Sequence, residues 1–166
     1  MSNHPHIINV KDVEPLTMSK GEKFSFSRRK LSGVTGGKDI SCSCFEVPPG
    51  KQAFPHHAHL GNEEAFFILS GEGTFRIGNE TFPVKSGDYI ACPVGEENAH
   101  SLLNTGKTPL TYLGISTSNH IDITIYPDSK KCGIVAGADA QKGLMSASFL
   151  KLWPDQPNVD YYLGEE

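Results

Sequence analysis

The chain of 166 residues lacks long apolar stretches and the segments that direct proteins into or across membranes. No run approaches the roughly 20 consecutive apolar residues that a membrane-spanning helix needs. The N-terminal residues also lack the basic start and apolar core of a signal peptide. We therefore expect a cytoplasmic protein without a membrane partner.

Cysteine is scarce, and its spacing does not suit a cysteine-based zinc site. The four cysteines are Cys42, Cys44, Cys92 and Cys132, and no two of them form a CxxC pair. A structural zinc site built from thiolates is therefore not expected. Cys42 and Cys44 share one face of an expected strand, where we predict that they are small buried side chains.

Basic residues form no stripe of the kind that a nucleic-acid-binding surface needs. The net charge is −4, with both signs mixed along the chain, so we expect no nucleic-acid partner. The one basic cluster is Arg28-Arg29-Lys30, which follows an alternating FSFS segment on an expected strand. We interpret this cluster as charge that protects an exposed strand edge, and a phosphate-binding site is the alternative.

Turn residues are plentiful and are spread between short β-rich runs. The 17 glycines and 11 prolines do not gather into a linker, which favours many strands joined by turns. Because this length suits one core, we predict a single all-β domain over residues 1–166. Strands are expected at residues 24–30, 40–47, 65–69, 74–77, 81–84, 110–116, 121–126 and 131–135.

Two terminal segments have no periodic pattern. Residues 1–20 indicate an irregular lead-in. Residues 137–166 form a tail that concentrates Trp153, Tyr161 and Tyr162, and a disordered polar tail would not gather aromatic residues in this way. We predict that this tail packs against the rest of its own chain or against a second subunit. Because exposed sheet edges favour pairing, we also expect a homodimer.

Four potential metal ligands lie in two blocks of the chain. His57 and His59 project from the same face of a strand because side chains alternate with period two. The LGNE segment after His59 has the Gly and Asn of a tight connection, and we expect a hairpin that returns Glu64 to the two histidines. His100 comes about forty residues later, so it must arrive from a separate strand, as a closed barrel allows.

These blocks resemble the two motifs of the cupin superfamily, G(X)5HXH(X)3,4E(X)6G and G(X)5PXG(X)2H(X)3N. The first block fits from the histidines to Gly71, although Gly50 stands one residue too far from His57. Taking His56 as the first histidine would put Ala58 at the second ligand position, and alanine cannot bind a metal. The second block fits except for four residues instead of two before its histidine. Its matching residues are Gly87, Pro93, Gly95, His100 and Asn104.

The resemblance covers roughly residues 40 to 118 and implies a cupin jelly-roll β-barrel that binds one divalent metal ion. The implied ligands are His57, His59, Glu64 and His100. This set of nitrogen and oxygen donors suits Mn, Fe, Zn, Ni, Co or Cu, and the sequence does not choose among them. An octahedral ion would keep two positions open for a small molecule, which favours catalysis over a structural role. Asn104 is expected to form the turn that aims His100.

The whole chain also resembles cupins described as mannose-6-phosphate isomerase-like or as sugar-phosphate isomerases. The leading hypothesis is a metal-dependent enzyme that isomerises a sugar or sugar phosphate, for which a base must lie beside the metal. A mononuclear metal dioxygenase and a non-catalytic cupin that binds a small molecule are the alternatives. Candidates for the catalytic base are Glu46, Tyr112, Asp122 and Tyr126. Phe66 shares the face of Glu64, so an apolar wall is expected beside the metal.

Overall fold

The chain folds into short β-strands joined by tight turns, with little helix. The computed structural model describes residues 4–139 and 144–165. The strands are β1 (Leu16–Lys20), β2 (Phe24–Lys30), β3 (Ile40–Val47), β4 (Ala58–His59), β5 (Glu64–Ser70), β6 (Glu72–Ile77), β7 (Glu80–Lys85), β8 (Tyr89–Cys92), β9 (His100–Leu103), β10 (Leu110–Thr117), β11 (Ile121–Tyr126), β12 (Lys131–Ala136) and β13 (Phe149–Pro154). The helical elements are η1 (Val10–Asp12), α1 (Leu31–Thr35), η2 (Glu96–Asn98), η3 (Pro127–Ser129) and η4 (Leu144–Ser146). Within the described ranges, no helix combines the length and apolar character of a membrane span.

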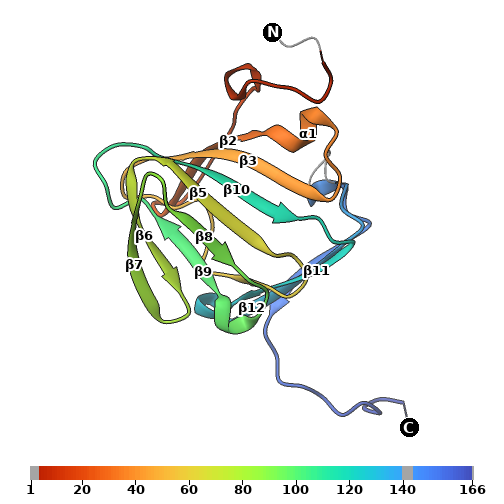
Figure 1. The fold of residues 1–166 in the computed structure, drawn as a ribbon. Helices are drawn as coiled ribbons and strands as arrows, with labels where there is room; N and C mark the ends of the chain where they lie inside the picture. Colours follow the sequence, from red (N-terminus) through yellow and green to blue (C-terminus); the bar gives the residue numbers. More distant parts are fainter. Residues whose placement is uncertain (1–3, 140–143, 166) are drawn as a thin grey trace.

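The strands pair into three sheets that wrap around one interior (Figure 1). The first sheet has the order β1-β2-β3-β10-β5-β8, the second β13-β12-β11-β4 and the third β7-β6-β9. Strands that are neighbours in these sheets are often far apart in the sequence, as with β3 and β10 or β4 and β11. The result is the all-β jelly-roll barrel that the sequence predicted.

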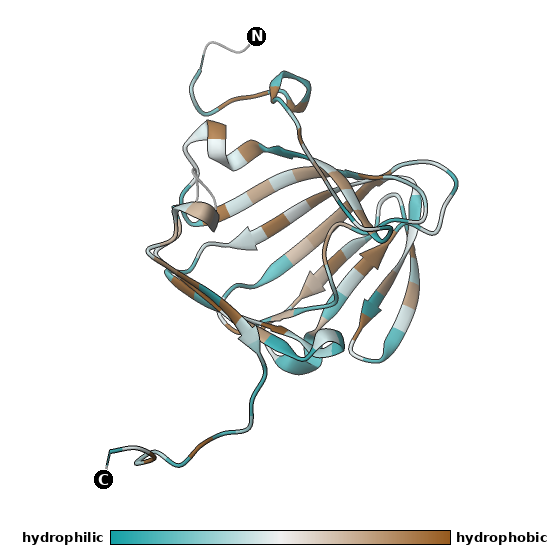
Figure 2. Ribbon diagram, turned by 180° about the vertical axis from the view of Figure 1, so that it is seen from behind, coloured by the Kyte–Doolittle hydropathy of each residue, from teal (hydrophilic) through white to brown (hydrophobic). Residues whose placement is uncertain are grey.

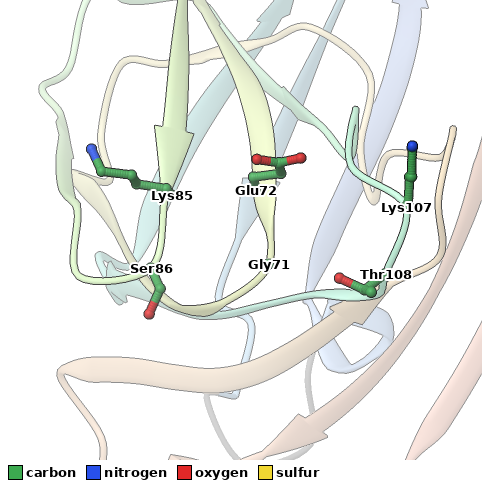
Figure 3. A pocket seen from close by; sticks show the side chains of 6 residues that line it. All are labelled: Gly71, Glu72, Lys85, Ser86, Lys107 and Thr108. Atoms are coloured by element: carbon green, nitrogen blue, oxygen red, sulfur yellow. The ribbon is translucent and has the colours of Figure 1, made fainter.

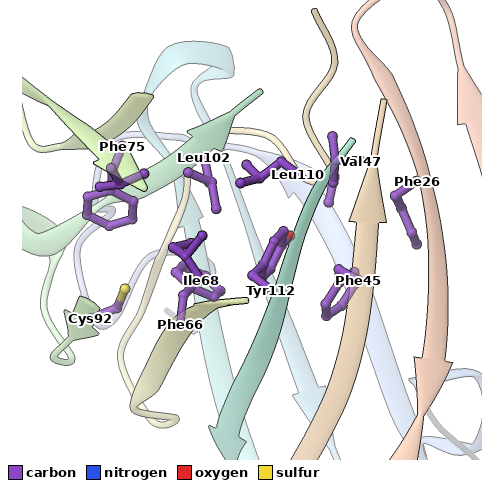
Figure 4. Packing of buried hydrophobic residues seen from close by; sticks show 12 residues of the cluster. Phe26, Phe45, Val47, Phe66, Ile68, Phe75, Cys92, Leu102, Leu110 and Tyr112 are labelled. Atoms are coloured by element: carbon purple, nitrogen blue, oxygen red, sulfur yellow. The ribbon is translucent and has the colours of Figure 1, made fainter. Parts of the chain in front are cut away.

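A buried apolar cluster fills the interior of the barrel (Figure 4). Hydrophobic and hydrophilic residues alternate along many strands (Figure 2), so one face of each strand turns inward. Phe26, Phe45, Ile68, Leu110 and Tyr112 come from four strands and meet in this cluster. Burying each such side chain stabilises the fold by about 2 kcal/mol.

The turn between β5 and β6 depends on Gly71. Its φ of +84° lies in the left-handed region, and an added Cβ would lie 2.7 Å from the carbonyl oxygen of Pro109. Both features require glycine at this position. The turn fixes where β6 starts and therefore how the third sheet closes the barrel beside β5.

The predicted strands agree closely with the observed ones, and the structure adds elements at both ends. Part of the lead-in forms η1 and β1, and α1 follows β2. The tail expected to be irregular contains β13, which pairs with β12 along its whole length. The connection after His59 is not a hairpin, because β4 pairs with β11 whereas β5 pairs with β8 and β10.

The tail divides into two parts. Trp153 lies in β13 and is half-buried against the barrel. After β13 the chain extends away from the barrel (Figures 1 and 2), where Tyr161 is 88% exposed and Tyr162 is 65% exposed. Within the single chain, the two tyrosines therefore do not pack on the barrel.

The interpretation of Arg28-Arg29-Lys30 as protection of an exposed edge is wrong for Arg28, which pairs with Leu16 of β1 on one side and with Phe45 of β3 on the other. Arg29 and Lys30 extend past the end of β1 and pair with β3 alone, so this end of β2 does lie at the sheet edge. All three basic side chains are half-buried. What these side chains can contact therefore depends on the face of β2 from which each one projects.

Candidate metal centre

Backbone pairing brings the histidines of the two sequence blocks together. The amide of His57 donates to the carbonyl oxygen of His100 at 3.0 Å, and the amide of His100 donates to the carbonyl oxygen of His57 at 2.7 Å. His59 lies in β4, where it pairs with Thr124 of β11. Glu64 begins β5. Residues from separate strands therefore surround one point at the end of the barrel.

The imidazoles of the three histidines converge on one carboxylate oxygen. The Nε2 atoms of His57, His59 and His100 lie 3.8, 3.5 and 3.2 Å from Oε2 of Glu64. A metal ion about 2.1 Å from each donor places the donor atoms about 3 to 3.5 Å apart. The donor atoms of His57, His59 and Glu64 all lie within 4.8 Å of one another and could hold one metal ion. His100 adjoins this group through its 3.2 Å approach to Glu64.

The second nitrogen of each ring supports this assignment. Nδ1 of His57 lies 2.8 Å from the carbonyl oxygen of Pro55, and Nδ1 of His100 lies 3.0 Å from that of Asn98. A carbonyl oxygen only accepts hydrogen bonds, so each Nδ1 carries the proton. Nε2 of each ring therefore faces Glu64. Its lone pair is available to a metal when the ring is neutral, and a ring protonated at both nitrogens donates to Glu64 instead, as the 3.2 Å separation between Nε2 of His100 and Oε2 of Glu64 allows.

Asp122 holds the third ring. Its Oδ2 accepts a hydrogen bond from Nδ1 of His59 at 2.5 Å, and its Oδ1 accepts the amides of Gly61 and Asn62 at 3.0 and 3.1 Å. Both carboxylate oxygens are thus engaged. Asp122 fixes the orientation of His59 and ties it to the loop between β4 and β5.

Burial and neighbouring charges separate the acid–base behaviour of these groups. Burial lowers the pKa of His57 to about 4, so its ring is neutral at neutral pH. Burial also acts to lower the pKa of His59, but the hydrogen bond to Asp122 and the charges of Glu64 and Asp122 outweigh it and raise that pKa. For Glu64, burial is outweighed by the hydrogen bond from His100 and by the three rings, which lower the pKa. The pKa of Asp122 is lowered against the effect of burial, chiefly by His59.

Comparison with known proteins agrees with this geometry. Residues 43–116 match the family model described as a cupin domain. A candidate sugar phosphate isomerase from Acidithiobacillus ferrooxidans superposes with a TM-score of 0.78 at 21% identity, over 94% of this chain and 97% of that one. A sugar phosphate isomerase of a cupin superfamily from Silicibacter pomeroyi superposes with a TM-score of 0.75 at 16% identity, over 89% and 92%. At these identities the likeness shows the fold.

Residues 43–116 are a cupin domain, and the fold of the chain is that of a cupin. An oxalate-binding protein from Thermotoga maritima is 39% identical to this cupin over 70 residues, which cover 42% of this chain and 55% of that protein. The chain spans between 34% and 55% of the length of three curated relatives that it matches, one of which is this oxalate-binding protein. What these relatives bind or catalyse as whole proteins bears on this chain only as a proposal.

The four candidates for the catalytic base lie in different surroundings in this cupin. Glu46 is exposed on β3 and alternates with the buried Phe45 and Val47, so it points away from the interior. Tyr112 is buried in the core, where burial and then the charge of Glu64 raise its pKa. The ring of Tyr126 stacks against that of His57, with centroids 6.0 Å apart. Tyr126 is half-buried, so it is the candidate tyrosine that lies beside the histidines without being enclosed in the core.

His56 and Asn104 lie close to the candidate ligands in the sequence but are not among them. His56 is buried, and its surroundings include the charges of Arg76 and Asp128. Asn104 does not contact His100 in the described contacts; its amide nitrogen donates to the carbonyl oxygens of Val47 and Thr108 at 2.8 and 2.9 Å. It therefore braces the loop after β9.

The hydrogen bond from His59 to Asp122 was not predicted, because the two residues lie 63 positions apart and no motif connects them.

A hollow of about 350 Å³ is lined by residues of the β5–β6 turn, the end of β7 and the loop before β10 (Figure 3). It is found where β5 ends, whereas Glu64 is where that strand begins. Its lining residues are Gly71, Glu72, Lys85, Ser86, Lys107 and Thr108. The candidate metal ligands are therefore at the opposite end of β5 from this hollow.

Proposed function

We propose that His57, His59, Glu64 and His100 bind one divalent metal ion in a metal-dependent enzyme. The substrate is a small oxygenated molecule, and isomerisation of a sugar or sugar phosphate is the leading reaction. The observation that carries the proposal is that all three Nε2 atoms approach one Glu64 oxygen within 3.2 to 3.8 Å. Their Nδ1 atoms are engaged elsewhere. Such an arrangement is typical of a site prepared for a metal.

The donor set suits Mn, Fe, Zn, Ni, Co or Cu. When bound, the ion polarises a carbonyl oxygen and a neighbouring hydroxyl of the substrate. The chain contributes orientation: Phe66 packs edge-on against His100 with ring centroids 5.7 Å apart and forms an apolar wall. The ring of Tyr126 stacks beside that of His57, and in this proposal its phenol donates a hydrogen bond to a substrate oxygen.

A non-catalytic binding protein is the second candidate function. It is favoured by the 39% identity to the oxalate-binding protein of Thermotoga maritima. Oxalate offers two adjacent oxygens to a metal, as a hydroxy-carbonyl sugar does, so one open metal centre serves either ligand. The general base decides between the two functions, because binding does not need one and isomerisation does.

We further propose that residues 1–166 act as one domain in a cytoplasmic homodimer. The four cysteines are free thiols, in keeping with a reducing compartment. Support for the dimer comes from Tyr161 and Tyr162, which are exposed in the single chain and which a second copy can cover.

Metal analysis and two assays test the proposed function. His59→Ala should abolish stoichiometric metal in protein purified without added metal, and full retention by elemental analysis would rule out the ligand set. Protein loaded separately with Mn, Fe, Zn or Ni is then assayed for aldose to ketose conversion and for oxygen uptake. Conversion without oxygen uptake supports an isomerase. Oxygen uptake with iron supports a dioxygenase, and tight binding of an unreacted ligand supports the binding protein.

A further inference from the structure

The side chains of Arg28 and Lys30 project from the face of β2 that turns toward the barrel interior. Phe26, two residues before Arg28, is buried in the core on this same face. In the pairing with β3, Arg28 lies opposite Phe45 and Lys30 lies opposite Ser43, and both partners are buried. Directly opposite residues of an antiparallel pair share a face, so the two cations lie on the inner face of the sheet.

The same face leads across the sheet to Glu64. Ser43 pairs with Gly114 of β10, and Gly114 pairs with Phe66 of β5. Phe66 follows Glu64 by two residues and therefore shares its face. Lys30 is three strands away, which corresponds to about 14 Å at about 4.8 Å per strand. A molecule that contacts both the candidate metal ligands and the two cations would therefore have to bridge this distance, less the reach of the side chains themselves.

Serine hydroxyls lie along the path between these two groups. Ser116 is directly opposite Glu64 on β10, and Ser41 is directly opposite Ser116 on β3. Ser43 belongs to the same inner face of β3. Hydroxyls both donate and accept hydrogen bonds, so this strip of the sheet suits a polyhydroxylated molecule.

Within the described part of the chain, neither Arg28 nor Lys30 forms an ion pair. Burial lowers the pKa of both groups, and the charge of Arg28 lowers that of Lys30 further, although Asp139 acts in the opposite direction. The Nε atom of Arg28 is buried and has no hydrogen-bond partner. Adjacent, partly buried cations are unfavourable unless negative charge compensates them.

We propose that Arg28 and Lys30 form an anion subsite, which binds a phosphate or carboxylate group at the end of the substrate remote from the metal. The inference rests on the proposed function, because it takes the metal centre as the site for the other end of the same molecule. The planar guanidinium of Arg28 matches either anion through paired hydrogen bonds. The ammonium of Lys30 adds a second positive charge, and its aliphatic stem packs beside Gly33 of α1.

Arg29 provides a matched control for this subsite. It has the same charge as Arg28, it is also half-buried, and its Nε atom likewise has no hydrogen-bond partner. It pairs with Cys44 and therefore lies on the opposite face of β2 from Arg28. Replacing either arginine removes one positive charge from the same strand, so a difference between the two variants reports the face and not the net charge.

Titration calorimetry with glucose 6-phosphate, glucuronate and glucose tests the subsite. These sugars differ in the group at carbon six, which is phosphate, carboxylate or hydroxyl. We expect Arg28→Gln to weaken binding of the preferred anionic sugar about tenfold or more, since charge-assisted hydrogen bonds are lost. Arg29→Gln should change it less than about twofold, and neither variant should affect glucose. Lys30→Met provides a second test and should weaken the same anionic sugar if Arg28→Gln fails to fold.

The outcomes separate this subsite from the metal centre. A preference for glucose 6-phosphate identifies a phosphate subsite, and a preference for glucuronate identifies a carboxylate subsite. No preference for either anion over glucose, or equal losses in the Arg28 and Arg29 variants, overturns the proposal. If metal content in these samples is full, that result refutes the subsite alone. Conversely, full metal content in His59→Ala, with anion preference intact, refutes the metal centre alone.

Discussion

The two ends of strand β5 face very different parts of the same interior. At its start, Glu64 meets the imidazoles of His57, His59 and His100. Four residues later on the same face, Ile68 is fully buried in the apolar cluster. One face of a single strand therefore carries a candidate metal ligand at one end and the packing that stabilises the barrel at the other.

The difference shows how the fold supports a polar centre without filling its core with polar groups. At the metal end, each ring is held through its second nitrogen by a carbonyl oxygen or by Asp122. At the other end, Ile68 and Leu110 have no exposed surface, and their burial provides stability in the absence of any metal. Changes at the two ends should therefore have separable effects on stability and on metal binding.

The largest change in stability is expected from Ile68→Ala at the apolar end. Removing most of a fully buried side chain should lower the free energy of unfolding by about 3 kcal/mol, because contacts are lost and a cavity remains. Metal content per folded molecule should stay stoichiometric. Denaturant unfolding and elemental analysis measure the two quantities, and a loss of metal in folded Ile68→Ala protein would show that the two ends are coupled.

A pH dependence is expected at the polar end of metal-free protein. Because burial lowers the pKa of His57 to about 4, the unfolded chain binds a proton at this residue from about pH 6.5 downward, whereas the folded protein does not until about pH 4. The contribution of His57 to stability is therefore present above pH 6.5 and decreases as the pH falls. Between pH 7.5 and pH 5 the decrease should be about 2 kcal/mol.

Denaturant unfolding of wild-type and His57→Gln protein at both pH values measures this contribution as a difference. The comparison matters because His59, with its raised pKa, acts in the opposite direction and gains stability as the pH falls to its unfolded pKa. An NMR titration should show His57 titrating near pH 4 and His59 above 6.5. Equal pH dependence in the two proteins would contradict the assignment for His57.

Much of this fold was predictable because short alternating runs and turn residues are local signals. The expected strands at residues 24–30, 40–47 and 121–126 match β2, β3 and β11. Strand β13 was missed because Phe149 to Pro154 has no alternating pattern, and its pairing with β12 depends on tertiary contacts. The pairing of β1 with β2 was also missed. Leu16 and Met18 alternate with Thr17 and Ser19, but the run has only five residues and all of them are exposed.

The grouping of the metal-binding candidates followed from motif spacing, whereas their supporting contacts did not. His57 and His59 are related by strand geometry, and His100 by its place in the second block. Asp122 was considered as a base, but the structure connects it to His59 through a hydrogen bond over a long sequence separation. Contacts of this kind depend on how β11 packs beside β4, and neither strand's sequence alone predicts that packing.

A smaller effect is expected from Asp122→Asn, which removes charge behind His59 while it keeps a hydrogen-bond acceptor. Metal affinity should fall about 10-fold to 100-fold, because the carboxylate fixes the ring and raises its basicity. Asp128→Asn is the control: Asp128 pairs with Arg76 at 2.7 Å on the surface and should alter metal affinity less than about twofold. Competition with a chromophoric chelator measures both affinities, and equal affinities in the two variants would exclude the role of Asp122.

The smallest change in barrel stability is expected from shortening the tail after Asp155. This end point keeps β13 and the hydrogen bond from the amide of Asp155 to the carbonyl oxygen of Lys130 at 2.9 Å. The residues removed include Tyr161 and Tyr162, which make little contact with the barrel in the single chain. The free energy of unfolding, measured at a concentration where both proteins are monomeric, should therefore change by less than about 0.5 kcal/mol.

At higher concentration, light scattering should show a dimer for the full chain and a monomer for the shortened one, because the aromatic rings would supply the buried core of the interface. A shortened chain that still dimerises would move the interface to the sheet edges, and a less stable monomer would show that the tail contacts its own barrel in solution.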